Sequence, residues 1–194
     1  MRVSLTLAAA LLTLGAPAFA AEAPSPATLK AQAALERSLP FEDRQDFEFA
    51  ARGYIGTLAD PVIRRADGGV AWDLTAYDFT KGERPATVNP SLWRHNQLMA
   101  LSGLFQVSDR IWQVRGFDAA NATFIQGDTG WIVIDPLTTA ETAAAALRLA
   151  NEKLGARPVV AIVYTHSHAD HFGGVKGMVS QADVDAGKVQ VIAP

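Results

Sequence analysis

The sequence predicts an α/β domain, and three observations carry this prediction. Four short apolar segments rich in β-branched and aromatic residues are typical of strands, and they occupy residues 104–107, 111–114, 122–125 and 131–134. An Ala- and Leu-rich segment, 138–154, then has the composition of a helix. A last apolar segment, 159–164, has the character of a buried strand, and it leads directly into a cluster of histidines.

Turn and cap residues set the limits of these elements. Residues 127–130 read Gly-Asp-Thr-Gly and predict a tight hairpin loop between the last two of the four strands. Thr138 or Thr139 is expected to cap the helix, and Gly155 is expected to end it. Beyond the histidines, we expect a helix to begin within residues 175–182 and a further strand at 189–192.

The first hundred residues have a different character. Helices are expected over 28–39, over 43–52 with Phe47 and Ala50 on its inner face, and over 91–99. Residues 59–91 contain several prolines and glycines and predict a long arm with one short strand, 70–74. Such an arm is ordered only by packing on another surface. His95, in the third helix, is expected to be a structural or surface residue.

The histidine cluster predicts a metal site. His166, His168, Asp170 and His171 form the pattern HxHxDH, which contains three of the four histidines of the chain. Imidazole and carboxylate are common zinc ligands. We expect His166 and His168 to converge on one ion, and Asp170 and His171 to serve a second ion about 3.5–4 Å away. The alternative is a solvated histidine-rich loop without metal. The chain has no cysteine, so a cysteine-based zinc site is excluded.

Other polar residues near the cluster have weaker claims. Asp135, at the end of the strand 131–134, either orients an imidazole ligand or caps the turn before Pro136, and both interpretations stay open. Thr165 and Ser167 are also close enough in sequence to form hydrogen bonds near the site. Asp183 and Asp185 lie in a polar stretch, 181–188, which is expected to be a surface loop and not to bind metal.

The HxHxDH pattern followed by Gly173 and Gly174 resembles the metallo-β-lactamase superfamily of metallohydrolases. The sequence segments 41–53, 116–125 and 164–177 resemble one branch of it, the linear alkylsulfatases. The resemblance implies the N-terminal half of an αββα sandwich, preceded by an extended arm that wraps it. It also implies hydrolysis of alkyl sulfate esters such as dodecyl sulfate by the intact parent, with two zinc ions and with Asp170 as both ligand and catalytic residue.

The same resemblance places further ligands, the sulfate-binding residues and a dimerization region downstream of residue 194. We therefore expect a fragment of a homodimeric parent, inactive by itself. Two alternatives stay open. One is another hydrolase of the same fold, such as a lactonase, a thioesterase or a β-lactamase. The other is a non-catalytic metal-binding protein, if 194 residues are the full length.

Composition and targeting signals complete the expectations. The net charge is −3, without a basic stripe, which argues against a nucleic-acid partner. Residues 1–20 read as a signal peptide that is cleaved after Ala20, too short and too broken for a membrane anchor. The mature protein is therefore expected in the periplasm or outside the cell. The predicted division is a signal peptide (1–20), an N-terminal helix and wrapping arm (21–100) and a truncated metallo-β-lactamase-like domain (101–194).

Overall fold

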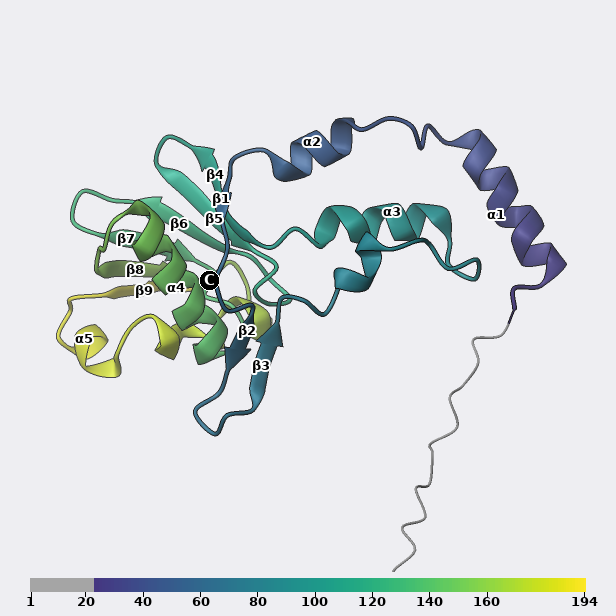
Figure 1. Ribbon diagram of the computed structural model, residues 1–194. Helices are drawn as coiled ribbons and strands as arrows, with labels where there is room; N and C mark the ends of the chain where they lie inside the picture. Colours follow the sequence, from purple (N-terminus) through teal and green to yellow (C-terminus); the bar gives the residue numbers. More distant parts are fainter. Residues whose placement is uncertain (1–22) are drawn as a thin grey trace, which may run out of the picture.

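A seven-stranded mixed sheet forms the centre of the computed structural model, which describes residues 23–194 (Figure 1). Its strands, in spatial order, are β1 (Tyr54–Gly56), β4 (Gly103–Ser108), β5 (Ile111–Arg115), β6 (Ala122–Gln126), β7 (Trp131–Ile134), β8 (Val159–Val163) and β9 (Gln190–Ile192). Neighbours from β1 to β7 are antiparallel, whereas β7, β8 and β9 are parallel. The carboxyl ends of β7 and β8 therefore meet at the same edge of the sheet.

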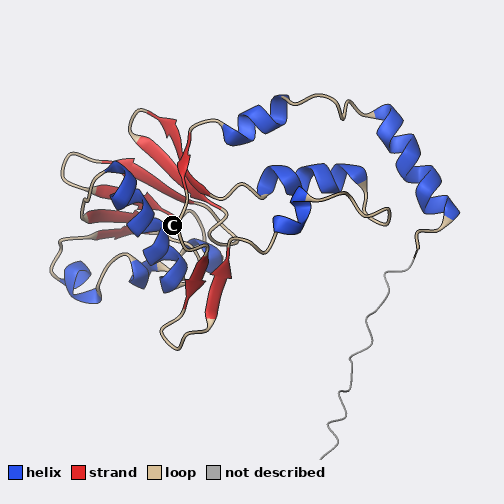
Figure 2. Ribbon diagram, viewed as in Figure 1, coloured by secondary structure: helices blue, strands red, loops and turns tan. Residues whose placement is uncertain are grey.

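One helix, α4 (Ala140–Leu154), lies across one face of this sheet (Figure 2). Its inner side carries Ala143, Ala146 and Ala150, all fully buried, and these small side chains let the helix lie close to the strands. Thr139 caps the helix through a capping box with Thr142, as expected for one of the two candidate threonines. The helix is followed by a glycine in the left-handed region, at a φ of 93°.

Trp131 anchors the core between α4 and the sheet. Its ring is fully buried, and it makes edge-to-face contacts with Trp112 and Phe124 from the two preceding strands. Its indole Nε1 donates to Asn151 Oδ1 on α4 at 2.8 Å, so the one polar atom of the ring has a partner. The opposite face of the sheet is different, because Ile125, Ile132 and Ile134 are only half-buried there.

The N-terminal part extends from one side of the sheet (Figure 1). It contains α1 (Pro26–Ser38), α2 (Gln45–Ala51), the hairpin of β2 (Val62–Arg64) and β3 (Val70–Asp73), the 3-10 helix η1 (Asp78–Lys81) and α3 (Pro90–Met99). Both α1 and α3 start with a proline, behind a capping side chain from Ser25 and Asn89. The β2–β3 hairpin packs against α4, and Leu58 and Ile63 belong to the main core.

The predicted strands and the main helix are confirmed, as are the α/β class and one sheet with a helix layer on one face. Two strands were missed. The first, β1, is a three-residue edge strand that directly follows Gly53 and ends at Gly56, and β2 is a short partner of the predicted strand at residue 70. The segment 175–182, where a helix was expected to begin, forms the 3-10 helix η3 (Val175–Gly177) and then the start of α5 (Gln181–Asp185).

The expectation of a surface loop over 181–188 is wrong for its first five residues. Ser180 caps α5 by accepting a hydrogen bond from the Asp183 backbone, and this turns the polar stretch into a short helix. The predicted signal peptide, residues 1–20, lies outside the described residues. Among residues 23–194, the model contains no helix with the length and apolar character needed to span a membrane.

Candidate metal centre

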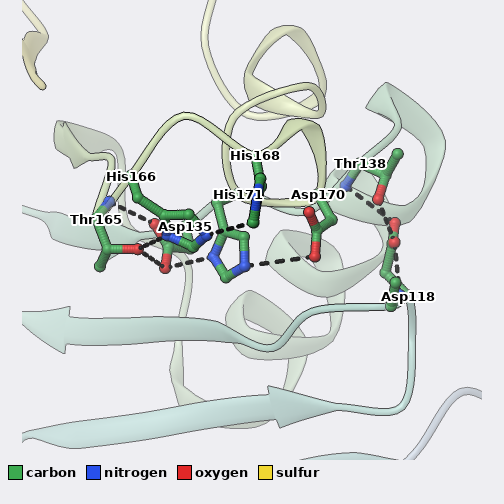
Figure 3. Close-up of polar contacts among 9 residues, drawn as sticks. Asp118, Asp135, Thr138, Thr165, His166, His168, Asp170 and His171 are labelled. Carbon is green, nitrogen blue, oxygen red and sulfur yellow. Dashed lines mark hydrogen bonds and ion pairs between the residues drawn. The ribbon is translucent and has the colours of Figure 1, made fainter.

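The predicted ligands lie on a loop at the carboxyl edge of β7 and β8 (Figure 3). The backbone of Asp135, directly after β7, donates to Val163 at the end of β8 at 3.0 Å. The loop then leaves β8 and passes through the 3-10 helix η2 (Ala169–His171), which brings Asp170 and His171 back toward the sheet. His168 is exposed, whereas His166, Asp170 and His171 are half-buried, so the cluster is open to solvent.

Asp135 is the centre of the hydrogen bonds around this loop. Its Oδ1 accepts from the Thr165 backbone at 2.8 Å, and its Oδ2 accepts from the Thr165 hydroxyl at 2.7 Å and from His171 Nδ1 at 2.8 Å. Burial alone raises the pKa of the carboxyl, but these three hydrogen bonds outweigh it and hold the pKa below its ordinary value. Asp135 is therefore an ionised acceptor, and the interpretation that it orients an imidazole is the one its contacts support.

Asp135 also has an unusual backbone. Its φ is 57°, and Leu137 has a φ of 64°; both lie in the left-handed region, which is uncommon for side chains other than glycine. Such conformations persist only where surrounding contacts hold them, and they concentrate at functional sites. The backbone of the turn 135–139 is therefore held in this conformation by the residues that the turn contacts.

The hydrogen bonds also set the tautomers of two imidazoles. Because the Asp135 carboxylate only accepts, His171 carries a proton on Nδ1, and a neutral His171 ring therefore has its lone pair on Nε2. The Thr165 hydroxyl donates to Asp135, so at 2.9 Å it accepts from Nδ1 of His166. His166 therefore also leaves its lone pair on Nε2. Lone pairs in these positions are what a metal ligand needs.

The four predicted ligands fall into two contacting pairs. His166 Nε2 lies 3.0 Å from His168 Nδ1, and His171 Nε2 lies 3.3 Å from Asp170 Oδ2. The rings of His166 and His171 are 4.0 Å apart between centroids, so the two pairs adjoin each other. These are the same pairs that the sequence assigned to two ions, and that assignment stays a prediction.

The donor set fits a divalent metal in kind. Two ligands on one tetrahedral zinc ion, each about 2.0–2.1 Å from it, lie about 3.3 Å from each other. Both pairs have a spacing close to this value. Within residues 23–194, however, no three His, Cys, Asp or Glu side chains are arranged to hold a single ion. Two side chains for each ion leave the other coordination positions to water or to further protein groups.

Two glycines press the ligand loop against the turn 135–139. A Cβ at Gly173 would lie 2.3 Å from the Thr138 carbonyl oxygen, and one at Gly174 would lie 2.2 Å from that of Pro136. The Gly174 backbone donates to the Leu137 carbonyl at 2.8 Å. The glycines are thus required by the close approach of the loop backbone to this turn.

Asp118 is a polar residue that the sequence did not single out. It is 8% exposed, and its carboxylate accepts hydrogen bonds from the Ala119 and Thr138 backbones and from the Thr138 and Thr142 hydroxyls. It lies within the sequence segment 116–125, but the residues next to it in sequence do not indicate that its partners are about twenty positions away. The only sequence signal is a group of threonines at the start of a helix.

The remaining candidates lie outside the cluster. His95 is exposed on α3, as predicted. Asp183 accepts from Ser180 and from Lys188, and these contacts hold the pKa of this exposed carboxyl below its ordinary value. Asp185 accepts a hydrogen bond from the Gln181 side chain along α5. Both carboxylates are therefore engaged in the surface of the short helix, away from the ligand loop.

Comparison with known proteins covers the region of this cluster. The model of the metallo-beta-lactamase superfamily matches residues 115–194, a range that begins at the last residue of β5 and contains the whole cluster. An alkyl/aryl-sulfatase of Saccharomyces cerevisiae is 53% identical over 87% of this chain and 26% of its own length. An (R)-specific secondary-alkylsulfatase of Pseudomonas sp. is 49% identical over 97% of this chain and 30% of its own length.

A solved structure has the same fold. The stereoselective inverting sec-alkylsulfatase of Pseudomonas sp. is 50% identical, with a TM-score of 0.80 over 86% of this chain and 26% of that one. The chain thus spans between 26% and 30% of the length of these relatives. By the matched range, residues 115–194 are similar to the metallo-beta-lactamase superfamily, and by these relatives the chain is similar to a part of alkylsulfatases.

Proposed function

We propose that this chain contributes the HxHxDH ligands to a metal-dependent hydrolase that converts alkyl sulfate esters into an alcohol and sulfate. The observation that carries the proposal is the pairing of His166 with His168 and of Asp170 with His171 at the carboxyl edge of the sheet. Relatives named as alkylsulfatases, about half identical to this chain, support the choice of substrate class.

The metal follows from the donors. Similarity to the superfamily implies a metal cofactor, and we propose zinc, two ions in all, because three imidazoles and a carboxylate are zinc ligands of the usual kind. When bound, a pair of divalent ions supplies hydroxide near neutral pH and offsets the negative charge of a sulfate ester. The ligands alone do not select zinc, because other divalent metals bind the same kinds of side chain.

The side chains of this chain have defined roles in the proposal. Nε2 of His166 and Nδ1 of His168 face each other and form one ligand pair, and Oδ2 of Asp170 and Nε2 of His171 form the other. Asp135 and Thr165 keep the protons of His171 and His166 on Nδ1, away from the ligand atoms. The solvent exposure of His168 leaves the cluster accessible to a small molecule.

Sulfate release from dodecyl sulfate by the whole protein tests the function. Activity is expected to disappear when a chelator removes the metal and to return with added zinc. Asp170→Ala is expected to lower kcat/KM at least about 100-fold, because it removes a ligand. Asp185→Ala, an exposed carboxylate on α5, is the matched control and should retain full activity. Activity that survives both chelation and Asp170→Ala refutes the proposal.

The 194-residue chain alone gives a second test. We expect it to bind zinc through the two ligand pairs but not to release sulfate, since each pair is incomplete. Titration against a coloured chelator measures the binding, and His166→Ala should weaken it while His95→Ala, on the exposed side of α3, should not. Equal affinity for the two variants contradicts the ligand assignment.

Two further proposals concern the whole protein. We propose that it is exported to the periplasm or beyond, because residues 1–20 have the three regions of a cleavable signal peptide. Mass spectrometry of the exported protein is expected to show Ala21 as its first residue. An exported protein that still contains residues 1–20 overturns this proposal.

We also propose a homodimer, which light scattering of the whole protein tests directly.

A further inference from the structure

We infer that Asp118 is a positioning residue for the metal centre, since it fixes the turn on which the ligand loop rests. The inference depends on the proposed function for its meaning, but its structural part is independent of metal. Asp118 follows β5, on a loop that lies beside the beginning of α4 (Figure 3). It is outside the ligand motif and contacts none of the four predicted ligands.

The Asp118 carboxylate is saturated with hydrogen bonds. Its Oδ1 accepts from the Ala119 backbone at 2.7 Å and from the Thr138 hydroxyl at 2.5 Å. Its Oδ2 accepts from the Thr138 backbone at 3.1 Å and from the Thr142 hydroxyl at 2.6 Å. Three of the four donors belong to the turn before α4 or to its first turn. A buried carboxylate with this many donors is rigid, and its loss leaves buried donors without partners.

These contacts are not needed to begin the helix. Thr139 and Thr142 already form a complete capping box, in which each side chain meets the backbone of the other. Asp118 adds hydrogen bonds to Thr138, the residue before the cap. It holds Thr138 by both its amide and its hydroxyl. The extra hydrogen bonds therefore act on the turn 135–139.

This turn is the surface against which the ligand loop lies. The Thr138 carbonyl oxygen lies so close to Gly173 that a Cβ on this residue would clash with it. The Leu137 carbonyl accepts a hydrogen bond from the Gly174 amide. The other end of the turn is Asp135, whose carboxylate holds His171. The turn thus contacts the ligand loop at both ends, and Asp118 holds it through the amide and the hydroxyl of Thr138. Displacement of Thr138 would move Gly173, two residues from His171.

The test uses Asp118→Ala, with Asn151→Ala as a matched control. Asn151 is also an acceptor on α4, for Trp131 Nε1 and the Arg157 backbone, but it lies at the other end of the helix. Both variants lose stability. The exchange rate of the Gly174 amide with deuterium, measured without metal, is expected to rise about 10-fold or more in Asp118→Ala beyond the change in core amides. In Asn151→Ala it should follow the core amides only.

Zinc affinity is the second measurement. Loss of an outer contact to a metal site lowers affinity about 10–100-fold, and we expect a loss in this range for Asp118→Ala and none for Asn151→Ala. Asp118→Asn keeps the shape and one acceptor oxygen, and it should fall between wild type and Asp118→Ala. If Asp118→Ala does not fold, Asp118→Asn decides the question by the same two measurements.

The outcomes separate the two proposals. Wild-type exchange at Gly174 together with wild-type zinc affinity in a folded Asp118 variant overturns the positioning role and leaves the proposed function intact. A wild-type chain that binds no zinc counts against the metal ligands, and Gly174 exchange then decides alone whether Asp118 holds the loop. A loss of zinc affinity in Asn151→Ala as large as in Asp118→Ala reduces the effect to stability and also overturns the inference.

Discussion

Oδ2 of Asp135 lies 2.8 Å from Nδ1 of His171, and this contact joins the end of β7 to the far end of the ligand loop. The same oxygen accepts the Thr165 hydroxyl, which in turn meets His166. One carboxylate therefore sets the proton positions of two of the three clustered imidazoles. It also explains why Asp135, which is not one of the proposed ligands, bears on the chemistry of the site.

Replacement of Asp135 by asparagine should reverse the tautomer of His171. The amide oxygen can still accept from the Thr165 backbone, but the amide NH₂ then faces Nδ1 and donates to it. The proton of His171 moves to Nε2, the proposed ligand atom, and zinc affinity should fall about 10–100-fold. Nitrogen NMR shifts of His171 report the tautomer, and a chelator titration reports the affinity. An unchanged tautomer with wild-type affinity contradicts this role.

His168 should change its tautomer when zinc binds. Nε2 of His166 has a lone pair, so Nδ1 of His168, 3.0 Å away, must be the donor in the metal-free chain. As a ligand, the same Nδ1 needs a lone pair, and the proton has to leave it. Nitrogen NMR with and without zinc measures this directly. His95 serves as the internal reference, and its shifts should not move; an Nδ1 proton that stays on His168 with zinc bound rejects the pairing.

The sequence was most informative where local chemistry decides the structure. The strands, the capped helix α4 and the ligand loop after β8 follow from apolar patterns and cap residues, because each is determined by near neighbours. The edge strand β1 could not be predicted, since its three residues, which include Gly56, pair only because β4 offers an open edge.

Long-range contacts explain the rest of what was missed. Asp118 gains its role from threonines that are 20 and 24 positions away, so no local pattern marks it. Asp135 was left between two interpretations because its partner His171 is 36 positions away. The polar segment that became α5 lacked an apolar stripe, and only the cap at Ser180 distinguishes it from a loop. Topology, not composition, joins these residues.

Gly174→Ala should destabilise the chain and weaken zinc binding together. A Cβ at this position would lie 2.2 Å from the Pro136 oxygen and 2.6 Å from the Thr139 oxygen, so the loop has to move away from the turn. Overpacking of this kind costs about 1–3 kcal/mol. Gly82→Ala is the control, because its nearest contact is the Phe79 oxygen at 3.4 Å and its backbone is ordinary for alanine. Urea denaturation compares the two, and equal stabilities reject the close-approach argument.

Adjacent residues of β7 should respond in opposite ways to threonine. Val133 is fully buried under α4, and a hydroxyl there has no partner, so Val133→Thr should cost about 1–3 kcal/mol of unfolding free energy. Ile132 points to the other face, where Ile125 and Ile134 are also half-buried, and Ile132→Thr should cost less than about 1 kcal/mol.

The apolar side chains on this second face also favour self-association of the chain. Sedimentation should therefore show less self-association for Ile132→Thr than for wild type, and urea denaturation should show the larger loss in Val133→Thr. The reverse order of stabilities would mean that the second face, and not the face under α4, carries the core of this chain.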